Sequence, residues 1–193
     1  MGRIVITEFV SLDGVMEDPG GAEDFRHGGW TFEFERGDEG NQFKVDELAD
    51  AEAMLLGRRT YEGFADAWPK REGEFADKFN SMPKYVVSGT LTDPEWNNTT
   101  VLEPGDLADE VAKLRDLERD VLVNGSVQLV RALLDAGLVD ELRLMVFPTL
   151  LGAGKRLFGD GGDEKGLRLT ESRPAGETLI VIYVPTAEAE GKG

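Results

Sequence analysis

Cysteine is absent from the sequence, and histidine occurs once, at His27. The lack of cysteine excludes disulfides, a thiolate nucleophile and cysteine-ligated zinc or iron–sulfur centres. A single histidine also excludes clustered-histidine metal sites, so we expect chemistry without a metal. His27 lies in a glycine-rich stretch, Arg26-His27-Gly28-Gly29, where an ordinary loop residue is the expected role rather than a catalyst.

Long apolar runs and an excess of basic residues are also missing. No segment approaches the roughly 20 apolar residues that a membrane span needs, and no basic, apolar leader begins the chain. Lys and Arg number 21 against 38 Asp and Glu, which gives a formal net charge of -17. Such a charge repels the nucleic-acid backbone. We therefore expect a soluble protein of the reducing cytoplasm that binds neither membrane nor nucleic acid and acts on a small molecule.

The residues that are present suffice for one folded domain. The chain has 193 residues, of which 40% are hydrophobic, so it can bury a substantial core but has the usual size of one domain. No repeat or interdomain linker is visible. We expect a single domain over residues 1–185 and a polar, frayed tail over residues 186–193.

Hydrophobic periodicity predicts that strands alternate with helices. Strands are expected at 4–10, 53–56, 84–88, 121–123 and 141–147, and helices at 43–51, 60–64, 106–117 and 127–136. Residues 19–40 are expected to form a long loop with aromatic anchors, and 167–169 and 178–184 an antiparallel pair around a turn at 173–176. The fold class is therefore α/β with three layers. A mixed, mostly parallel sheet, with a C-terminal antiparallel strand pair, is covered by helices on both faces.

Ligands of such sheets bind at the carboxyl ends of the strands. At the first unusual strand end, Gly57 ends the strand, and Arg58, Arg59 and Thr60 open the next helix. Unpaired backbone N–H groups and the helix dipole make a helix start an anion site, whereas arginines there oppose the dipole unless an anion is bound. The pattern favours phosphate binding over solvated surface charge.

Two further strand ends are less specific. The run Asn124-Gly125-Ser126-Val127 repeats the order of strand, glycine turn and helix, with Ser126 as a cap, but an ordinary tight turn is an equal alternative. The run Ser88-Gly89-Thr90 offers hydroxyls and an open backbone to phosphate or ribose, or forms a simple turn. No glycine-rich stretch has the spacing of the Rossmann or Walker pattern.

Taken together, these segments resemble the C-terminal reductase domain of the bifunctional riboflavin-biosynthesis deaminase/reductase, which has a dihydrofolate-reductase-like fold. The resemblance spans nearly the whole chain. It rests on Phe9-Val10-Ser11-Leu12-Asp13-Gly14, Leu56-Gly57-Arg58-Arg59-Thr60-Tyr61, Val123-Asn124-Gly125-Ser126, Leu138-Val139-Asp140-Glu141-Leu142 and Pro148-Thr149-Leu150-Leu151-Gly152-Ala153-Gly154. The deaminase half needs zinc-binding cysteines, so only the reductase half is expected in this chain.

The resemblance implies a reductase that binds NADPH. By that resemblance the phosphates lie along Gly57, Arg58, Arg59 and Thr60, the adenosine end at Ser88 and Gly89, and the pyrophosphate at Asn124, Gly125, Ser126 and Val127. The residues themselves also favour NADPH over NADH, because Arg58 and Arg59 can meet a 2′-phosphate. No acidic residue lies between Gly57 and Tyr61, or between Val87 and Thr92, to accept from a free 2′-hydroxyl.

The same resemblance places the substrate beside the first strand and its loop. Asp13, Gly14 and Trp30 are expected near the substrate, and Phe147 and Leu151 in the wall of its pocket. Asp13 is the candidate catalytic carboxylate, although an Asp-Gly turn residue that bonds its own backbone is an equal alternative. Dihydrofolate reductase carries an acid on the helix after the first loop. Asp46, Glu47 and Asp50 occupy that region without an unambiguous match, and we expect them at the surface.

The expected reaction is hydride transfer from the nicotinamide C4 to an electrophilic C=N or C=O carbon, with a proton from water or a nearby carboxylate. A pterin-like compound, a pyrimidine or a phosphoribosylamino-pyrimidine could be the substrate, and Lys155 and Arg156 are candidates to bind its phosphate. A nucleotide- or pterin-binding protein without turnover is the alternative. The C-terminal strand pair is expected to leave a sheet edge that a second copy covers, and relatives of this type are typically homodimers.

Overall fold

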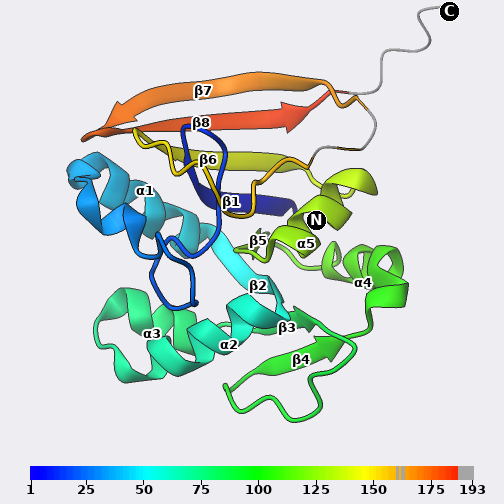
Figure 1. Ribbon diagram of the computed structural model, residues 1–193. Coiled ribbons are helices and arrows are strands. Elements are labelled where there is room, and N and C mark those ends of the chain that lie inside the picture. Colours follow the sequence, from blue (N-terminus) through cyan, green and yellow to red (C-terminus); the bar gives the residue numbers. More distant parts are fainter. Residues whose placement is uncertain (160, 162–163, 187–193) are drawn as a thin grey trace, which may run out of the picture.

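A single sheet organises the chain in the computed structural model, which describes residues 1–159, 161 and 164–186 (Figure 1). Within these residues the sheet has eight strands in the order β4-β3-β2-β5-β1-β6-β8-β7. The strands are β1 (Ile4–Ser11), β2 (Ala51–Gly57), β3 (Lys84–Val87), β4 (Thr99–Leu102), β5 (Asp120–Val123), β6 (Glu141–Phe147), β7 (Leu167–Ala175) and β8 (Thr178–Pro185).

The strands run parallel from β4 to β6 and antiparallel where β8 joins β6 and β7 joins β8. The predicted mixed, mostly parallel sheet with a C-terminal antiparallel pair is therefore confirmed. The turn of that pair is shorter than predicted, because Ala175 already pairs with Thr178. Strand β7 extends well beyond the predicted 167–169. Nearly all of it is exposed, so its side chains show no alternation from which a strand could be predicted.

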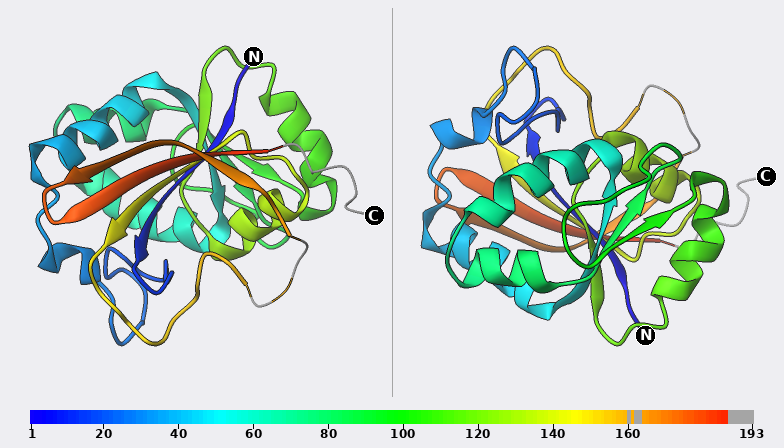
Figure 2. Two further views of the ribbon diagram at one scale, coloured as in Figure 1. Left: turned by 90° about the horizontal axis from the view of Figure 1, so that it is seen from above. Right: turned by 90° about the horizontal axis from the view of Figure 1, so that it is seen from below.

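Helices cover both faces of the sheet (Figure 2). They are α1 (Gly37–Asp50), α2 (Arg58–Ala67), α3 (Glu74–Ser81), α4 (Leu107–Leu114) and α5 (Val127–Asp135), with short 3-10 turns at Trp30–Glu33, Trp68–Lys70 and Pro104–Asp106. Apolar residues of α4 and α5 share one core with β1 and β5, whereas α1, α2 and α3 pack on the opposite face. In the described part of the chain, no helix has both the length and the apolar character to cross a membrane.

Some boundaries differ from the predictions. Helix α1 begins at Gly37, inside the predicted loop 19–40, where Asp38 and Glu39 in its first turn suit the positive end of the helix dipole. The short elements α3 and β4 were not predicted, because each buries too few apolar residues to show a period. Asp106 and Ser126 do precede α4 and α5, but neither side chain makes a capping hydrogen bond. The predicted tail lies outside the described residues except for Thr186.

Candidate functional site

A cavity opens where β5 ends and its neighbour β1 continues. Val123, the last residue of β5, pairs with Ile6, so the following residues of β1 have no strand beside them on this side. The chain after β1 returns to β2 on one side, and the chain after β5 returns to β6 on the other. Such a switch point leaves a crevice outside the carboxyl ends of the strands, which is where ligands of α/β sheets bind.

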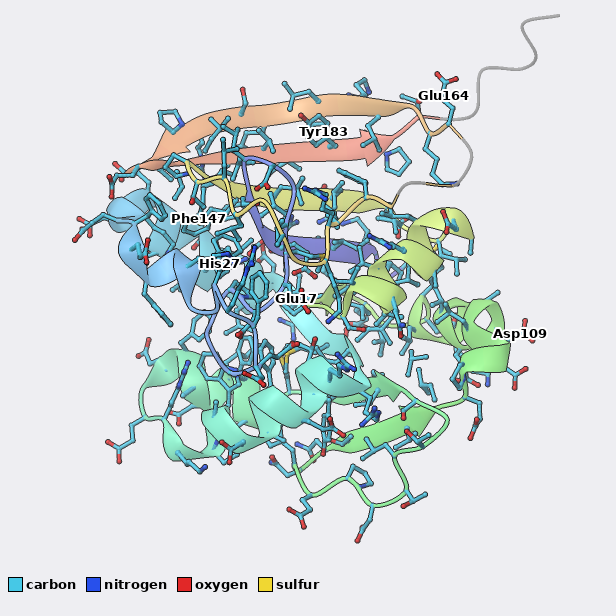
Figure 3. The ribbon with its side chains drawn as sticks, in the orientation of Figure 1. Glu17, His27, Asp109, Phe147, Glu164 and Tyr183 are labelled. Carbon is cyan, nitrogen blue, oxygen red and sulfur yellow. The ribbon has the colours of Figure 1, made fainter. Side chains whose placement is uncertain are left out.

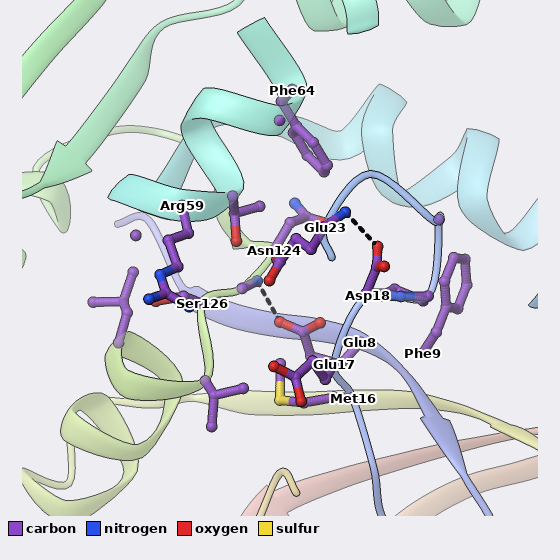
Figure 4. A pocket seen from close by; sticks show the side chains of 18 of the residues that line it. Glu8, Phe9, Met16, Glu17, Asp18, Glu23, Arg59, Phe64, Asn124 and Ser126 are labelled. Carbon is purple, nitrogen blue, oxygen red and sulfur yellow. Dashed lines mark hydrogen bonds between the residues drawn. The ribbon is translucent and has the colours of Figure 1, made fainter. Parts of the chain in front are cut away.

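The cavity has a volume of about 1380 Å³. Its lining includes all ten residues that the sequence predicted for the dinucleotide: Gly57, Arg58, Arg59, Thr60, Ser88, Gly89, Asn124, Gly125, Ser126 and Val127. They come from three segments that follow β2, β3 and β5. The structure therefore brings the three predicted strand ends together in the lining of one cavity, and we call these ten residues the dinucleotide wall. Figure 4 shows Arg59, Asn124 and Ser126 among them.

Two glycines let the turns of this wall approach each other. The Gly57 N–H donates to the Gly125 carbonyl at 3.2 Å. A Cβ atom on Gly57 would collide with Ser126, and one on Gly125, whose φ is 62°, would collide with the Thr60 hydroxyl. The peptide bond between Gly125 and Ser126 is cis. The hydrogen bond and the two glycines bring the N-termini of α2 and α5 to the same place, where backbone dipoles from both favour an anion.

The two arginines of α2 differ in their surroundings. Arg58 donates to Glu62 one turn along the helix, at 2.8 Å. Arg59 forms no salt bridge within the described residues, and its side chain extends toward Ser126 at the start of α5 (Figure 4). Asn124 also faces the cavity, and its buried Nδ2 has no hydrogen-bond acceptor in the described part of the protein. An unpaired guanidinium and an unpaired amide donor are thus available to a ligand.

Ser88 has a structural role in its turn. Its Oγ accepts hydrogen bonds from the N–H groups of Thr90 and Leu91, at 3.1 and 3.0 Å. The hydroxyl proton can still be donated toward the cavity that Ser88 lines. Both sequence alternatives, a simple turn and a ligand contact, are compatible with this geometry.

A buried acid that the sequence analysis did not select lies on the floor of the cavity. Glu8 of β1 is 8% exposed and accepts a hydrogen bond from the Gly125 N–H. The pKa of Glu8 is raised to about 8. Burial is the main cause and nearby Glu47 adds to it, whereas the Gly125 hydrogen bond and Lys44 act in the opposite direction. The sequence does carry a signal for Glu8, because an acid stands in the middle of the apolar run Ile4–Val10. Charged side chains are rarely buried without a partner, so an acid at such a position points to a special role.

A second buried acid, Glu47 of α1, lies behind the cavity. The Thr7 hydroxyl donates to Glu47 Oε1 at 2.8 Å, Lys44 Nζ donates to Oε2 at 2.7 Å, and Arg143 Nη1 is 3.6 Å from Oε1. Glu47 is only 3% exposed, so the expectation that it is a surface acid was wrong, whereas Asp46 and Asp50 are exposed. Thr7 and Lys44 line the cavity, so Glu47 orients two side chains that a ligand can contact.

Comparison with protein families matches residues 3–181 to the RibD C-terminal domain family. The chain belongs to this family. Two relatives from Bacillus subtilis, the uncharacterized proteins YyaP and YwjB, are 29% and 26% identical over 93% and 94% of the chain, covering 93% and 97% of their own lengths.

Three solved structures share the fold of this chain. A Shewanella protein assigned provisionally to riboflavin biosynthesis has a TM-score of 0.77 at 21% identity, with 97% of this chain and all of that chain covered. Acinetobacter baumannii RibD has a TM-score of 0.66 at 19% identity, and the match covers 97% of this chain but 59% of RibD. A pyrimidine reductase-like protein of Corynebacterium diphtheriae has a TM-score of 0.64 at 15% identity, covering 97% of this chain and 93% of that one.

The five residues predicted for the substrate side of this RibD-type fold do not line the cavity: Asp13, Gly14, Trp30, Phe147 and Leu151. Trp30 is 3% exposed, donates from Nε1 to the Glu17 carbonyl at 2.9 Å and meets Phe147 edge-on at 5.3 Å. Phe147, between the sheet and α1, is fully buried, and Leu151 packs against the same cluster (Figure 3). These aromatic side chains form a core beneath the site.

Asp13 joins two loops through hydrogen bonds of its carboxylate. Its carboxylate accepts hydrogen bonds from the Ser11 hydroxyl at 2.6 Å and from the N–H groups of Leu151 and Gly152 at 3.1 and 2.8 Å. The Ser11 hydrogen bond is the main cause that lowers the pKa of Asp13. Only the Ser11 contact is local, and the other two reach a distant loop, so Asp13 has a structural role that differs from both the catalytic carboxylate and the turn residue that bonds its own backbone.

The connection from β1 to α1 supplies the remaining wall. We call residues 16–36 the lid segment. It contributes Met16, Glu17, Asp18, Ala22, Glu23 and Phe32, among others, to the cavity. His27 lies in it, packs edge-on against Phe25 at 5.5 Å and does not line the cavity (Figure 3). Lys155 and Arg156 line the cavity but are engaged, because Lys155 pairs with Glu17 and Arg156 Nε donates to the Asp13 carbonyl.

Proposed function

We propose that the protein is an NADPH-dependent reductase whose cofactor and substrate share this cavity. The observation that carries the proposal is the dinucleotide wall, where two helix N-termini and the unpaired Arg59 meet. An anion of two linked phosphates matches both the backbone dipoles and the guanidinium. The cavity also exceeds the about 300–1,000 Å³ of an ordinary ligand pocket, which leaves room for two ligands side by side.

The residues present fit a nicotinamide dinucleotide. The starts of α2 and α5, with Arg59, would hold the pyrophosphate, and Arg58, Ser88 and Gly89 the adenosine end. The free Asn124 Nδ2 is an unpaired donor for a carbonyl or hydroxyl of the ligand. When bound, the dihydronicotinamide supplies the hydride, and the protein orients it and keeps water away.

The substrate side has the character of a site for a planar anion. Phe9 and Phe34 line the cavity beside Lys44 and Arg36, whose cationic groups lie 5.0 and 5.5 Å from the centre of the Phe9 ring. Arg36 is half-buried and pairs with no acid within the described ranges. Aromatic rings suit a heterocycle, and the arginine suits a carboxylate or phosphate attached to it. A pterin, a pyrimidine or a phosphoribosylamino-pyrimidine would satisfy both.

Two measurements test the proposal. Calorimetry should give NADPH binding in the micromolar range or tighter. Loss of reduced-nicotinamide absorbance should follow on addition of a 7,8-dihydropterin, dihydrofolate or a phosphoribosylamino-pyrimidine. Binding without oxidation by any of the three would favour the alternative, a nucleotide- or pterin-binding protein without turnover. Absence of NADPH binding would contradict the proposal itself.

We also propose that the protein is a homodimer. Strand β7 is the outer strand of the sheet, and Leu167, Leu169 and Leu179 of the β7–β8 pair are exposed. An edge strand with apolar side chains offers both backbone and surface for pairing with a second copy. Light scattering should give twice the 21.2 kDa of the chain, and a monomer mass at micromolar concentration would contradict the proposal.

A further inference from the structure

Glu8 occupies a position that the fold reserves for an apolar residue. Side chains alternate along a strand, and Ile4, Ile6 and Val10 of β1 all enter the core shared with α4 and α5. Glu8 points to the same side, but no strand lies beside it there, because β5 has ended at Val123. The carboxyl group therefore faces the floor of the cavity instead of the core (Figure 4).

The hydrogen bond from Gly125 determines which oxygen of Glu8 can carry a proton. The Gly125 N–H donates to Oε1, so Oε1 acts as an acceptor. Within the described residues no hydrogen bond reaches Oε2, although Glu8 lines the cavity. A neutral carboxylic acid has one O–H donor. Its proton is therefore on Oε2, which is directed at the ligand space next to the dinucleotide wall.

Two other buried or half-buried acids of the cavity, Glu17 and Asp18, are held by neighbouring groups, whereas the exposed Glu23 lies at its rim. Glu17 is held by the backbone N–H and the ammonium group of Lys155. Burial raises the pKa of Glu17, but the Lys155 hydrogen bonds outweigh it, so the pKa lies below its usual range. Asp18 Oδ1 accepts from the N–H groups of Ala22 and Glu23, at 2.7 and 3.0 Å, and fixes the lid segment. Both oxygens of Glu17 are thus engaged, and the one oxygen of Asp18 that is free among the described residues, Oδ2, lies buried against Gly28 of the lid segment.

Charged groups from several elements face Glu8. Lys44 and Glu47 lie on α1, Glu17 on the lid segment and Arg59 on α2. Lys44 is shared with Thr7 and Glu47, which it contacts at 2.7 Å each, so its charge is not directed at Glu8 alone. Burial is the largest influence on Glu8, whose pKa of about 8 keeps most of it protonated at neutral pH.

We propose that Glu8 is the proton donor of the reductase reaction, an inference that rests on the proposed function. The substrate carbon of a C=N or C=O bond gains the hydride, and the electron pair of the double bond moves to the nitrogen or oxygen. That atom takes the proton from Glu8 Oε2, so the substrate gains one hydride and one proton while the dinucleotide is oxidised. The Glu8 carboxylate then regains a proton from water. General acids of this kind contribute about 100- to 10,000-fold to the rate.

Glu8→Gln tests the proposal without changing the shape of the side chain. The amide oxygen can still accept from Gly125, but the side chain cannot donate a proton and be reprotonated. The control is Glu171→Gln on exposed β7. The probes are NADPH with a 7,8-dihydropterin, whose N5=C6 bond needs a proton, and with its N5-methylated cation, which needs none. Glu8→Gln should slow the neutral pterin by about 100-fold or more and the cation by less than about threefold. Equal slowing of both acceptors would overturn the proposal.

Two further measurements distinguish a failure of the proposed role of Glu8 from a failure of the proposed reductase function. The wild-type rate with the neutral pterin should fall above about pH 8, where Glu8 ionises, and this limb should be absent in Glu8→Gln. Carbon-13 NMR of labelled glutamate, assigned with Glu8→Gln, should give a titration midpoint near 8 in the protein without ligands. A midpoint near 4.5 would overturn the inference even in an active reductase. If Glu8 titrates near 8 but NADPH is never oxidised, the proposed function fails, and the inference fails with it.

Discussion

The two walls of the cavity are built in different ways. The dinucleotide wall consists of short continuous segments, each a strand end, a glycine and a helix start, and the parallel strands bring these segments together. The opposite wall combines the lid segment, the exposed face of α1 and residues 154–159. The lid segment and residues 154–159 hydrogen-bond across a long sequence separation, as from the Met16 N–H to the Lys155 carbonyl. The first wall is therefore rigid and local, whereas the second depends on how distant loops pack. Five substitutions test this difference.

Trp30→Ala should have the largest effect, and on stability. Trp30 fills the core beneath the lid segment and contacts Phe147, so its removal should lower the free energy of unfolding by about 3–5 kcal/mol. The matched control is Phe32→Ala in the same 3-10 turn, because Phe32 is 77% exposed and lines the cavity. Urea denaturation should show little change for Phe32→Ala, whose KM should rise instead. If Trp30→Ala were stable and its KM were raised, the result would support the direct substrate contact of Trp30 that the sequence predicted.

Gly125→Ala should disable the dinucleotide wall. A Cβ atom at this position would collide with Thr60, and the positive φ strains any other residue. We expect NADPH affinity to fall by about 100-fold, or about 2.8 kcal/mol. Gly105→Ala is the control, because a Cβ atom there meets no neighbour. Calorimetry on the folded protein measures both. Unchanged affinity in Gly125→Ala would show that the turn has no part in cofactor binding.

Arg59→Ala and Arg58→Ala should separate two phosphate sites. Arg59 extends toward the start of α5, so its loss should weaken NADPH and NADH alike, by about tenfold. Arg58 must exchange Glu62 for a 2′-phosphate, so its loss should weaken NADPH by about threefold and leave NADH nearly unchanged. Glu62→Gln, which frees Arg58, should slightly tighten NADPH. Titration of each variant with NADPH and with NADH measures these changes in affinity. If the unmodified protein preferred NADH, the assignment of Arg58 to the 2′-phosphate would be wrong.

Asp13→Asn should have the smallest effect. Leu151 and Gly152 donate to different oxygens of Asp13, so the asparagine keeps an acceptor for only one of the two N–H groups, and we expect a loss of about 1 kcal/mol in stability. The kcat of the folded enzyme should change by less than about twofold. If Asp13 were the catalytic carboxylate, kcat would fall by about 100-fold or more. Steady-state kinetics together with a thermal melt distinguishes the structural role of Asp13 from a catalytic one.

The sequence by itself determined the segments of the dinucleotide wall and the mixed, mostly parallel character of the sheet. A strand, a glycine and a helix start are contiguous, so Gly57–Thr60 and Asn124–Val127 were recognisable without tertiary structure, and parallel strands place their ends at one edge. The apolar run Ile4–Val10 likewise specified β1.

Only the tertiary structure decided what each polar or aromatic residue around the cavity does. Asp13 lies two residues after the end of β1 in a turn-forming sequence, but contacts with Leu151 and Gly152, about 140 positions away, engage its carboxylate. Trp30 and Phe147 became core because α1 closes over them. Glu8 reaches the cavity because the pairing of β5 with β1 ends two positions before Glu8, and Glu47 is buried because Arg143 and Lys44 surround it. Burial and partners are set by distant segments, and no local pattern encodes them.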